Sequence, residues 1–337
     1  HIAKDKASDG GNDAVAWRCQ NVASCPAQLT RRVEYFSARK ALDIESLGGI
    51  VAEKLVESGL VKDPLDLFEL KLDVLGKLNL GTNDEPRVFG EKNAAKIIGA
   101  LEAARLRPLS RWLLAFAIPD LGEETAHDIA KFHESMEAIS SSKMLRDIIE
   151  LQRLNREMMQ HSPNTDENKG KSEAEKAAMK SYYESYKRQA DDLGEKMIAS
   201  GYARPAKKAN PPPRDAVTVI GPVAAQSAIE WFDSEIGRNA LRRLQALGIA
   251  PKSSQGVQSN SIIKGKTVVL TGTLEKMSRN EAQEKIRSLG GNVSSSVSRK
   301  TDLLVAGPGA GSKLEDAQKY GIKVISEADL LGMLGES

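Results

Sequence analysis

The stretch that decides the fold of the C-terminal part is Lys264–Leu274, KGKTVVLTGTL. Its β-branched run, Thr267–Leu270, predicts a buried strand, and Gly272 predicts a turn directly after it. Ser278 followed by Glu281 is typical of a capping box, so we expect a helix to begin there. Further strands are expected over Asn292–Val297, Leu303–Ala306 and Lys323–Ile325, with a helix over Ser312–Tyr320 between the last two. The order β-α-β-β-α-β-α predicts an α/β domain with a small parallel sheet flanked by helices.

Upstream of this domain the pattern is mostly helical. Residues 30–250 are expected to form short helices separated by Gly-centred turns, with apolar residues at a spacing of three to four. A charged insert at about 143–213 interrupts them with two long helices, which predict a helical hairpin, and ends in an extended basic linker around Pro211-Pro212-Pro213. Residues 251–261 are rich in Ser, Gln and Gly and predict a linker. We therefore expect a multidomain, mostly α protein whose last domain is 262–337.

Length and composition limit the class of protein. A chain of 337 residues with 40% apolar and 28% charged residues fits two or three soluble domains. The net charge of +2 is too small to establish nucleic-acid binding.

No apolar stretch approaches the roughly 18 residues of a membrane helix, and only two cysteines are present. We expect a cytoplasmic protein without a membrane partner. The first residue is not Met, so we expect a fragment.

The two cysteines, Cys19 and Cys25, are separated by five residues and followed by Pro26. Structural zinc needs four Cys or His ligands, so this pair forms at most half of a site. His1 is a conceivable third ligand, but a terminal residue is poorly held. Two free thiols in a loop are the alternative interpretation.

Four Gly-containing turns precede apolar-periodic helices. They are Leu47-Gly48-Gly49, Val88-Phe89-Gly90-Glu91-Lys92, Ile118-Pro119-Asp120-Leu121-Gly122 and Val219-Ile220-Gly221-Pro222-Val223. In a helix-hairpin-helix motif, such a turn exposes backbone N–H groups that hold a phosphate, and glycine permits its close approach. One such turn alone is more often an ordinary helix end. Four in one chain favour DNA binding, with Gly48, Gly49, Gly90, Lys92, Gly122 and Gly221 as candidate contacts.

The order of these features resembles the bacterial NAD-dependent DNA ligase family over most of the chain. The matching segments are Trp17-Arg18-Cys19, Cys25–Gln28, Ser37–Glu45, Phe89–Ala94, Leu121–Ala126 and Ile220–Ala224. The resemblance implies a partial four-cysteine zinc finger at 1–29, completed by an upstream CxxC, and a helix-hairpin-helix domain at 30–250. The chain departs from the family at Ala117, Pro119 and Val219, and its insert is not typical.

Residues 262–337 resemble a BRCT domain. In phosphate-binding members, a Ser/Thr-Gly after the first strand and a Lys at the start of the second helix hold one phosphate. Thr271, Gly272 and Lys313 match that arrangement, and a hydroxyl, a backbone N–H and an ammonium together suit a phosphate. A turn glycine and a solvated lysine are the alternative. Leu330 and Met333 stand where many BRCT domains carry a bulky aromatic residue.

The resemblance implies the DNA-gripping C-terminal region of a ligase that seals nicks in duplex DNA during replication and repair. The KxDG lysine that the family uses for adenylation is absent, so the chain alone supplies no catalytic residue. NAD and Mg would be bound by domains of the parent enzyme. We expect a monomer in the bacterial cytoplasm, near the nucleoid, whose partner is nicked duplex DNA. We also expect Gly90→Asp to impair DNA binding more than Lys92→Ala. The alternative is a non-catalytic DNA-repair scaffold, and an upstream KxDG and CxxC would decide between the two.

Overall fold

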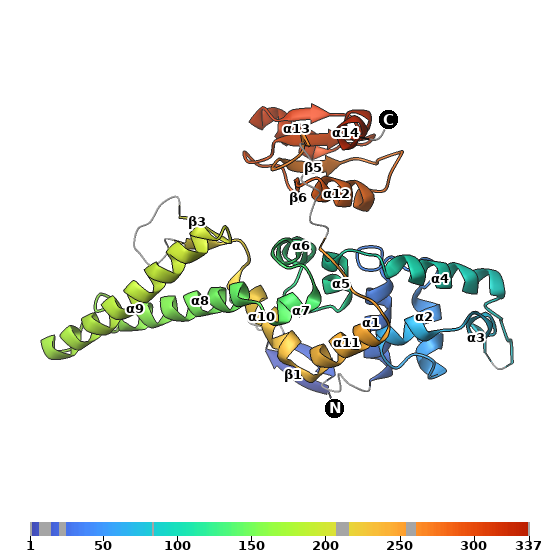
Figure 1. Cartoon of the computed structure of the whole chain (residues 1–337), viewed down its shortest axis with the longest axis horizontal. Helices are drawn as coiled ribbons and strands as arrows, with labels where there is room; N and C mark the ends of the chain where they lie inside the picture. Colours follow the sequence, from blue (N-terminus) through green and yellow to red (C-terminus); the bar gives the residue numbers. More distant parts are fainter. Residues whose placement is uncertain are drawn as a thin grey trace. The chain divides into compact units, whose positions relative to one another are not determined.

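The computed structural model divides the chain into two compact units, His1–Ser253 and Ser254–Ser337 (Figure 1). It describes residues 2–6, 15–19, 25–82, 84–206, 216–253 and 261–335, of which 2–6 and 15–19 are described by their backbone alone. No helix among these residues is both long and apolar enough to cross a membrane.

The N-terminal unit begins with two antiparallel strands and continues almost entirely in helices. Strand β1 (Ile2–Lys6) pairs with β2 (Val15–Cys19), with Ile2 opposite Cys19. The elements that follow are α1 (Pro26–Ser37), α2 (Gly49–Glu57), the 3₁₀ helix η1 (Pro64–Glu69), α3 (Leu72–Gly76), α4 (Glu91–Ala104), α5 (Leu109–Ala115), α6 (Glu123–Phe132) and α7 (Met136–Ser140). Helices α1 and α2, α3 and α4, and α5 and α6 pack in consecutive pairs.

Aromatic side chains lie at the centre of this unit although they are rare in the sequence. Phe36 on α1 makes edge contacts with Phe68, Trp112 and Phe116, at centroid distances of 6.3, 5.9 and 6.2 Å. Phe36 and Trp112 are both fully buried. Such ring pairs add about 0.5–1.5 kcal/mol each beyond area burial. The cluster therefore joins α1, η1 and α5 into one core.

The charged insert forms the predicted helical hairpin. Helices α8 (Lys143–His161) and α9 (Glu173–Ala199) run side by side (Figure 1). The buried seam of α8 includes Leu151, Leu154 and Met158. A capping box at Ser172 and Glu175 starts α9. Helix α8 also packs against α10, so its packing extends beyond the insert into the helical core.

Most of the extended basic linker expected around Pro211-Pro212-Pro213 lies outside the described residues, but the segments on either side of it are described. Strand β3 (Ala203–Pro205) pairs antiparallel with β4 (Ala216–Thr218), so both ends of the basic segment are held in a short ribbon. Gly194 of α9 is buried, and a Cβ added there would lie 3.1 Å from the Cβ of Ala216. The small residue therefore lets the ribbon approach α9 closely.

Two further helices, α10 (Pro222–Asp233) and α11 (Glu235–Ala246), complete the unit. Ser234 ends α10 and caps α11 by accepting a hydrogen bond from the N–H of Gly237 at 3.1 Å. Arg243 on α11 lies 3.0 Å from Asp63 and 2.7 Å from Asp66, which fixes α11 to η1. Residues 251–253, expected in the linker, belong to this unit, because the Lys252 carbonyl accepts a hydrogen bond from the N–H of Leu109 at 2.8 Å.

The C-terminal unit has the predicted parallel sheet. Its strands are β5 (Thr267–Thr271), β6 (Asn292–Ser294), β7 (Leu303–Ala306) and β8 (Lys323–Ile325), in the spatial order β6-β5-β7-β8. Its helices are α12 (Arg279–Ser288), α13 (Ser312–Tyr320) and α14 (Glu327–Leu334). Val268 and Leu270 lie in one core cluster and Val269 in another, so both faces of β5 are covered. The expected capping box at Ser278 and Glu281 starts α12.

Candidate nucleic-acid interface

Each of the four predicted turns places a glycine directly before a helix. Gly48, Gly90, Gly122 and Gly221 are the N-cap residues of α2, α4, α6 and α10. We call these segments the first to fourth glycine turns. The residue before each glycine is buried and anchors the turn in the core: Leu47, Phe89, Leu121 and Ile220. The sequence pattern thus corresponds to one repeated local structure.

The N-cap glycines leave open space at the helix ends. A Cβ added to Gly48, Gly90, Gly122 or Gly221 would meet no atom within 4 Å. A glycine N-cap also has no side chain that could accept hydrogen bonds from the first-turn N–H groups. Each turn therefore presents backbone donors without steric cover. Gly49 differs, because a Cβ there would lie against the Glu34 carboxylate.

Backbone conformation explains glycine at only one of the four N-caps. Gly90 has φ +87° and ψ 150°, a region almost closed to other residues. Gly48, Gly122 and Gly221 have φ of −88°, −78° and −65°, which any residue adopts. At these three positions, neither packing nor the backbone requires glycine.

Left-handed residues other than glycine occur in the first and third turns. Asp43, Ser46, Ala117 and Asp120 have φ between +49° and +68°. Ala117, a departure from the family pattern, thus adopts the left-handed conformation without being glycine. Asp120 is held by the Ser227 hydroxyl of α10, which donates to its Oδ2 at 2.7 Å. Tertiary contacts therefore stabilise a turn that the local sequence disfavours.

The charges at the turns are not equal. Helices α2 and α10 have no acidic residue in their first turn, whereas α4 begins with Glu91 and α6 with Glu123 and Glu124. A carboxylate near a helix N-terminus interacts favourably with the helix dipole and repels a second anion. Lys92, next to Glu91, is exposed. Because the Glu34 carboxylate lies beside Gly49 at the first turn, the fourth turn is the most open to an anion.

Exposed aliphatic side chains at the turns were not identified as site residues from the sequence. Ile50, Val88 and Val223 are 60%, 64% and 59% exposed. Each lies within two residues of an N-cap glycine. Ile50 and Val223 lie in the first turns of α2 and α10, and Val88 lies just before α4, so their apolar character alone does not distinguish them from core residues.

The BRCT candidates lie at the carboxyl edge of the parallel sheet. Thr271 ends β5 and is buried, with its carbonyl accepting a hydrogen bond from the N–H of Gly307 at 2.9 Å. Gly272 has φ +74°, and a Cβ there would overlap the Gly307 carbonyl oxygen. Lys313 is half-buried in the first turn of α13. Packing against Gly307 alone accounts for glycine at position 272. Strands β5 and β7 are adjacent and parallel, and the chain continues from β5 to β6 at one edge of the sheet and from β7 to β8 at the other. The carboxyl ends of such strands are a common place for ligands to bind in α/β domains.

The two cysteines are close in sequence but do not form a complete metal site. Cys19 ends β2, whose side chains lie outside the described residues, and Cys25 is the N-cap of α1. No group of three or more metal-binding side chains occurs in the part of the chain that the structure describes. The whole sequence holds only these two cysteines. The residues present therefore supply half of the donor set that structural zinc requires.

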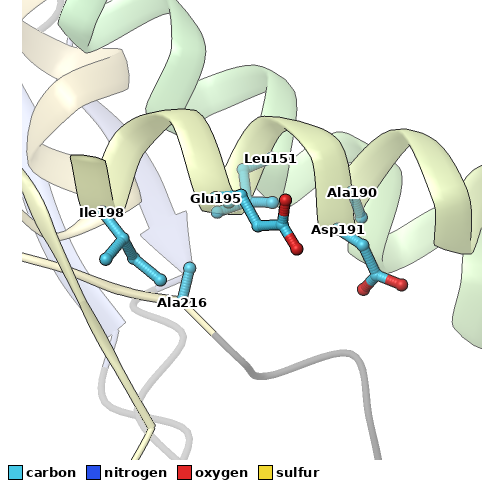
Figure 2. A pocket seen from close by; sticks show the side chains of 7 residues that line it. Leu151, Ala190, Asp191, Glu195, Ile198 and Ala216 are labelled. Carbon is cyan, nitrogen blue, oxygen red and sulfur yellow. The ribbon is translucent and has the colours of Figure 1, made fainter. Parts of the chain in front are cut away.

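A shallow hollow on the insert contains none of the predicted site residues. It lies between α8, α9 and β4, and Figure 2 shows the carboxylates of Asp191 and Glu195 beside apolar side chains of Leu151, Ile198 and Ala216. Lys187 forms an ion pair with Asp191.

His133 is a structural residue of the core. It is buried, with Nδ1 2.7 Å from the Ile129 carbonyl oxygen and Nε2 2.7 Å from the Ser142 hydroxyl. Burial lowers the pKa of His133, and the hydrogen bond to Ile129 offsets only part of that effect. A neutral ring that donates from Nδ1 and accepts the Ser142 hydroxyl proton satisfies both contacts.

Comparison with known proteins gives two kinds of match. Residues 258–334 match the BRCA1 C Terminus (BRCT) domain family. Along nearly its whole length the chain is also similar to proteins named DNA ligase. It is 41% identical to the DNA ligase of Akkermansia muciniphila over 95% of the chain and 41% of that protein. For Methylorubrum extorquens the identity is 35%, over 96% of the chain and 44% of the relative. For Paracoccus denitrificans it is 37%, over 94% and 39%.

The chain thus spans about two fifths of the length of the curated relatives that it matches. The family resemblance expected from the sequence is confirmed by these relatives and by the BRCT match. The chain fits the C-terminal part of a bacterial NAD-dependent DNA ligase.

Proposed function

We propose that this chain is the DNA-gripping region of a ligase and that it binds the phosphate backbone of duplex DNA without reading base sequence. The observation that carries the proposal is the repeated glycine N-cap. Four helices begin at a glycine with open space around it, and at three of these positions no internal constraint requires glycine. At Gly48 and Gly221, a phosphate that must approach the first-turn amides supplies the missing reason.

Each turn combines the elements that a DNA backbone requires. Backbone N–H groups and the helix dipole attract the phosphate, and an exposed aliphatic side chain such as Ile50 or Val223 is available for the apolar face of a deoxyribose. Lys92 adds a mobile positive charge at the second turn. Backbone amides do not distinguish bases, so binding through these turns is independent of sequence.

The turns contribute unequally in this proposal. The fourth has no acidic residue in the first turn of the helix that follows, so it holds phosphate most strongly, whereas the Glu34 carboxylate lies beside Gly49 at the first turn. The third carries Glu123 and Glu124 in its first helical turn, and Asp120 precedes its glycine. Their negative charge opposes a phosphate, so the third turn acts mainly through its packing with α10.

Further parts of the proposal extend to the whole protein. Thr271, Gly272 and Lys313 bind one phosphate at the carboxyl edge of the BRCT sheet. Cys19 and Cys25 supply two ligands of a zinc finger whose other two lie upstream. The parent enzyme seals nicks in duplex DNA in the cytoplasm as a monomer, with NAD and Mg bound by other domains. The family relationship supports this larger function.

The proposal is tested with fluorescently labelled DNA and the purified chain. Anisotropy titrations compare two duplexes of unrelated sequence with a single strand of equal length. We expect the two duplexes to bind with equal affinity and the single strand more weakly, because backbone amides read no base and a duplex presents two phosphate backbones to the turns. Equal binding of all three DNAs, or preference for one sequence, would contradict backbone recognition of duplex DNA.

A further inference from the structure

A small cavity lies in the N-terminal unit between α1, η1, the end of α5, α10 and α11. Its volume is about 190 Å³, and none of the candidate DNA contacts lines it. It is therefore separate from the glycine turns. The five elements come from distant parts of the sequence, so no local motif indicates the cavity.

One side of the cavity is aromatic and aliphatic. Phe116 and Trp231 line it with ring centroids 5.1 Å apart and ring planes 37° apart. Ile236 on α11 also lines it and is 51% exposed. Partly exposed aromatic rings of this kind favour a flat aromatic ligand, because stacking adds to the burial of apolar area.

The other side is polar and carries more positive than negative charge. Arg32 and Lys62 line the cavity together with one carboxylate, Asp63. Asp63 lies 3.5 Å from Arg32 but 3.0 Å from Arg243, so it is bound more closely by the arginine of α11. The Lys62 side chain is exposed, while its backbone N–H is fixed by Asp66 Oδ2 at 2.7 Å. The two cations can therefore hold an anionic group at the rim.

We propose that this cavity binds a single nucleotide unit, with the base on Trp231 and the phosphate at Lys62 and Arg32. The volume is below the roughly 300–1,000 Å³ of drug-sized sites. It therefore admits the base alone and leaves the phosphate at the charged rim. Asn239 lines the same cavity and offers both a donor and an acceptor to a base edge. The bound nucleotide is either a free mononucleotide or an unpaired nucleotide of a DNA strand.

The test uses the fluorescence of Trp231 in the full chain. The protein has three tryptophans, and Trp112 is fully buried in the core. We expect dAMP, or a short single-stranded oligonucleotide, to quench the fluorescence in a saturable manner, with a Kd between about 10 µM and 1 mM. The quench should disappear in Trp231→Phe. Calorimetry should show that Lys62→Ala weakens binding about tenfold, whereas the control Lys180→Ala, on the exposed face of α9 outside the cavity, has no effect.

The two probes distinguish the two sources of the nucleotide. Binding of dAMP alone supports a free mononucleotide, and binding of the oligonucleotide alone supports an unpaired nucleotide. The inference is overturned if neither probe binds saturably, if the quench persists in Trp231→Phe, or if Lys62→Ala and Lys180→Ala behave alike. The dAMP titration uses no duplex DNA, so failure of the duplex-binding proposal would be recognised separately.

Discussion

Replacing Gly221 by Asp separates a role in phosphate binding from a role in ending a loop. Gly221 has φ −65° and ψ 146°, an extended conformation that suits any residue before a proline, and Pro222 follows it. An added Cβ would meet no atom within 4 Å. Asp is also a favoured N-cap, because its carboxylate accepts hydrogen bonds from the first-turn amides. We therefore expect the substitution to keep or slightly raise thermal stability, by a few tenths of a kcal/mol.

DNA affinity should change in the opposite direction. The introduced carboxylate occupies the amides of α10 and faces a phosphate at close range. Two like charges 4 Å apart repel by about 4 kcal/mol at an effective dielectric constant of 20, and exposure and salt reduce this value. A net loss of about 1.4–2.8 kcal/mol, or tenfold to a hundredfold in affinity, is the expected result.

Gly221→Asn is the matched control, since it caps the helix without adding charge. Duplex affinity is measured by anisotropy and the thermal midpoint by circular dichroism for both variants. We expect the Asn variant to lose less affinity than the Asp variant, with similar midpoints. If Gly221→Asp binds DNA like the unmodified chain, the fourth turn does not hold a phosphate. Gly90→Asp is less informative, because φ +87° adds backbone strain to any effect on binding.

Three further predictions concern pH and metal. Burial places the folded-state pKa of His133 below its unfolded value near 6.5, so the stability contributed by the neutral ring should be complete above that pH and fall as the pH decreases below it. Thermal midpoints measured between pH 5 and 8 should lose part of this pH dependence in His133→Gln, and an unchanged dependence would contradict the assignment. Burial raises the pKa of Glu327, but hydrogen bonds from the backbone N–H groups of residues 275, 276 and 277 outweigh burial, and the net shift of the pKa is downward. The C-terminal unit should therefore lose stability as the pH falls below about 4.5. Glu327→Gln should weaken that loss in acid titrations followed by circular dichroism, and a titration curve identical to that of the unmodified chain would argue against this role. Finally, Cys19 and Cys25 fill only half of a tetrahedral shell, so the chain should release zinc to a mild chelator, whereas a chain extended by an upstream CxxC should retain it; stoichiometric zinc in the present chain after dialysis would refute this expectation.

Local signals allowed much of the fold to be predicted. The capping box at Ser278 and Glu281 marks a helix start because a side chain and a backbone N–H three residues apart satisfy each other. The β-branched run of β5 likewise indicated a strand buried on both faces. The four glycines before apolar-periodic helices were recognised for the same reason, since glycine at a helix end is a local feature.

Features that depend on tertiary contacts were not predictable. The ribbon formed by β3 and β4 joins segments on either side of the basic linker, and residues with low strand propensity, such as Pro205, gave no sign of it. Asp120 is held in a left-handed conformation by Ser227, more than one hundred residues away in sequence. The cavity beside Trp231 is lined by residues of five elements that are distant in sequence, so no spacing of residues in the sequence predicted it. These features arise from packing, which a one-dimensional pattern does not encode.

The salt dependence of duplex binding tests the central claim most directly. If the first, second and fourth glycine turns each hold at least one phosphate, the slope of log K against log salt concentration should be about −2.7 or steeper, at about −0.9 per neutralised phosphate. The measurement is an anisotropy titration of one duplex with the purified chain at five or more potassium chloride concentrations. A straight line with that slope supports phosphate-backbone binding by the repeated turns. A slope near zero, at measurable affinity, would contradict it.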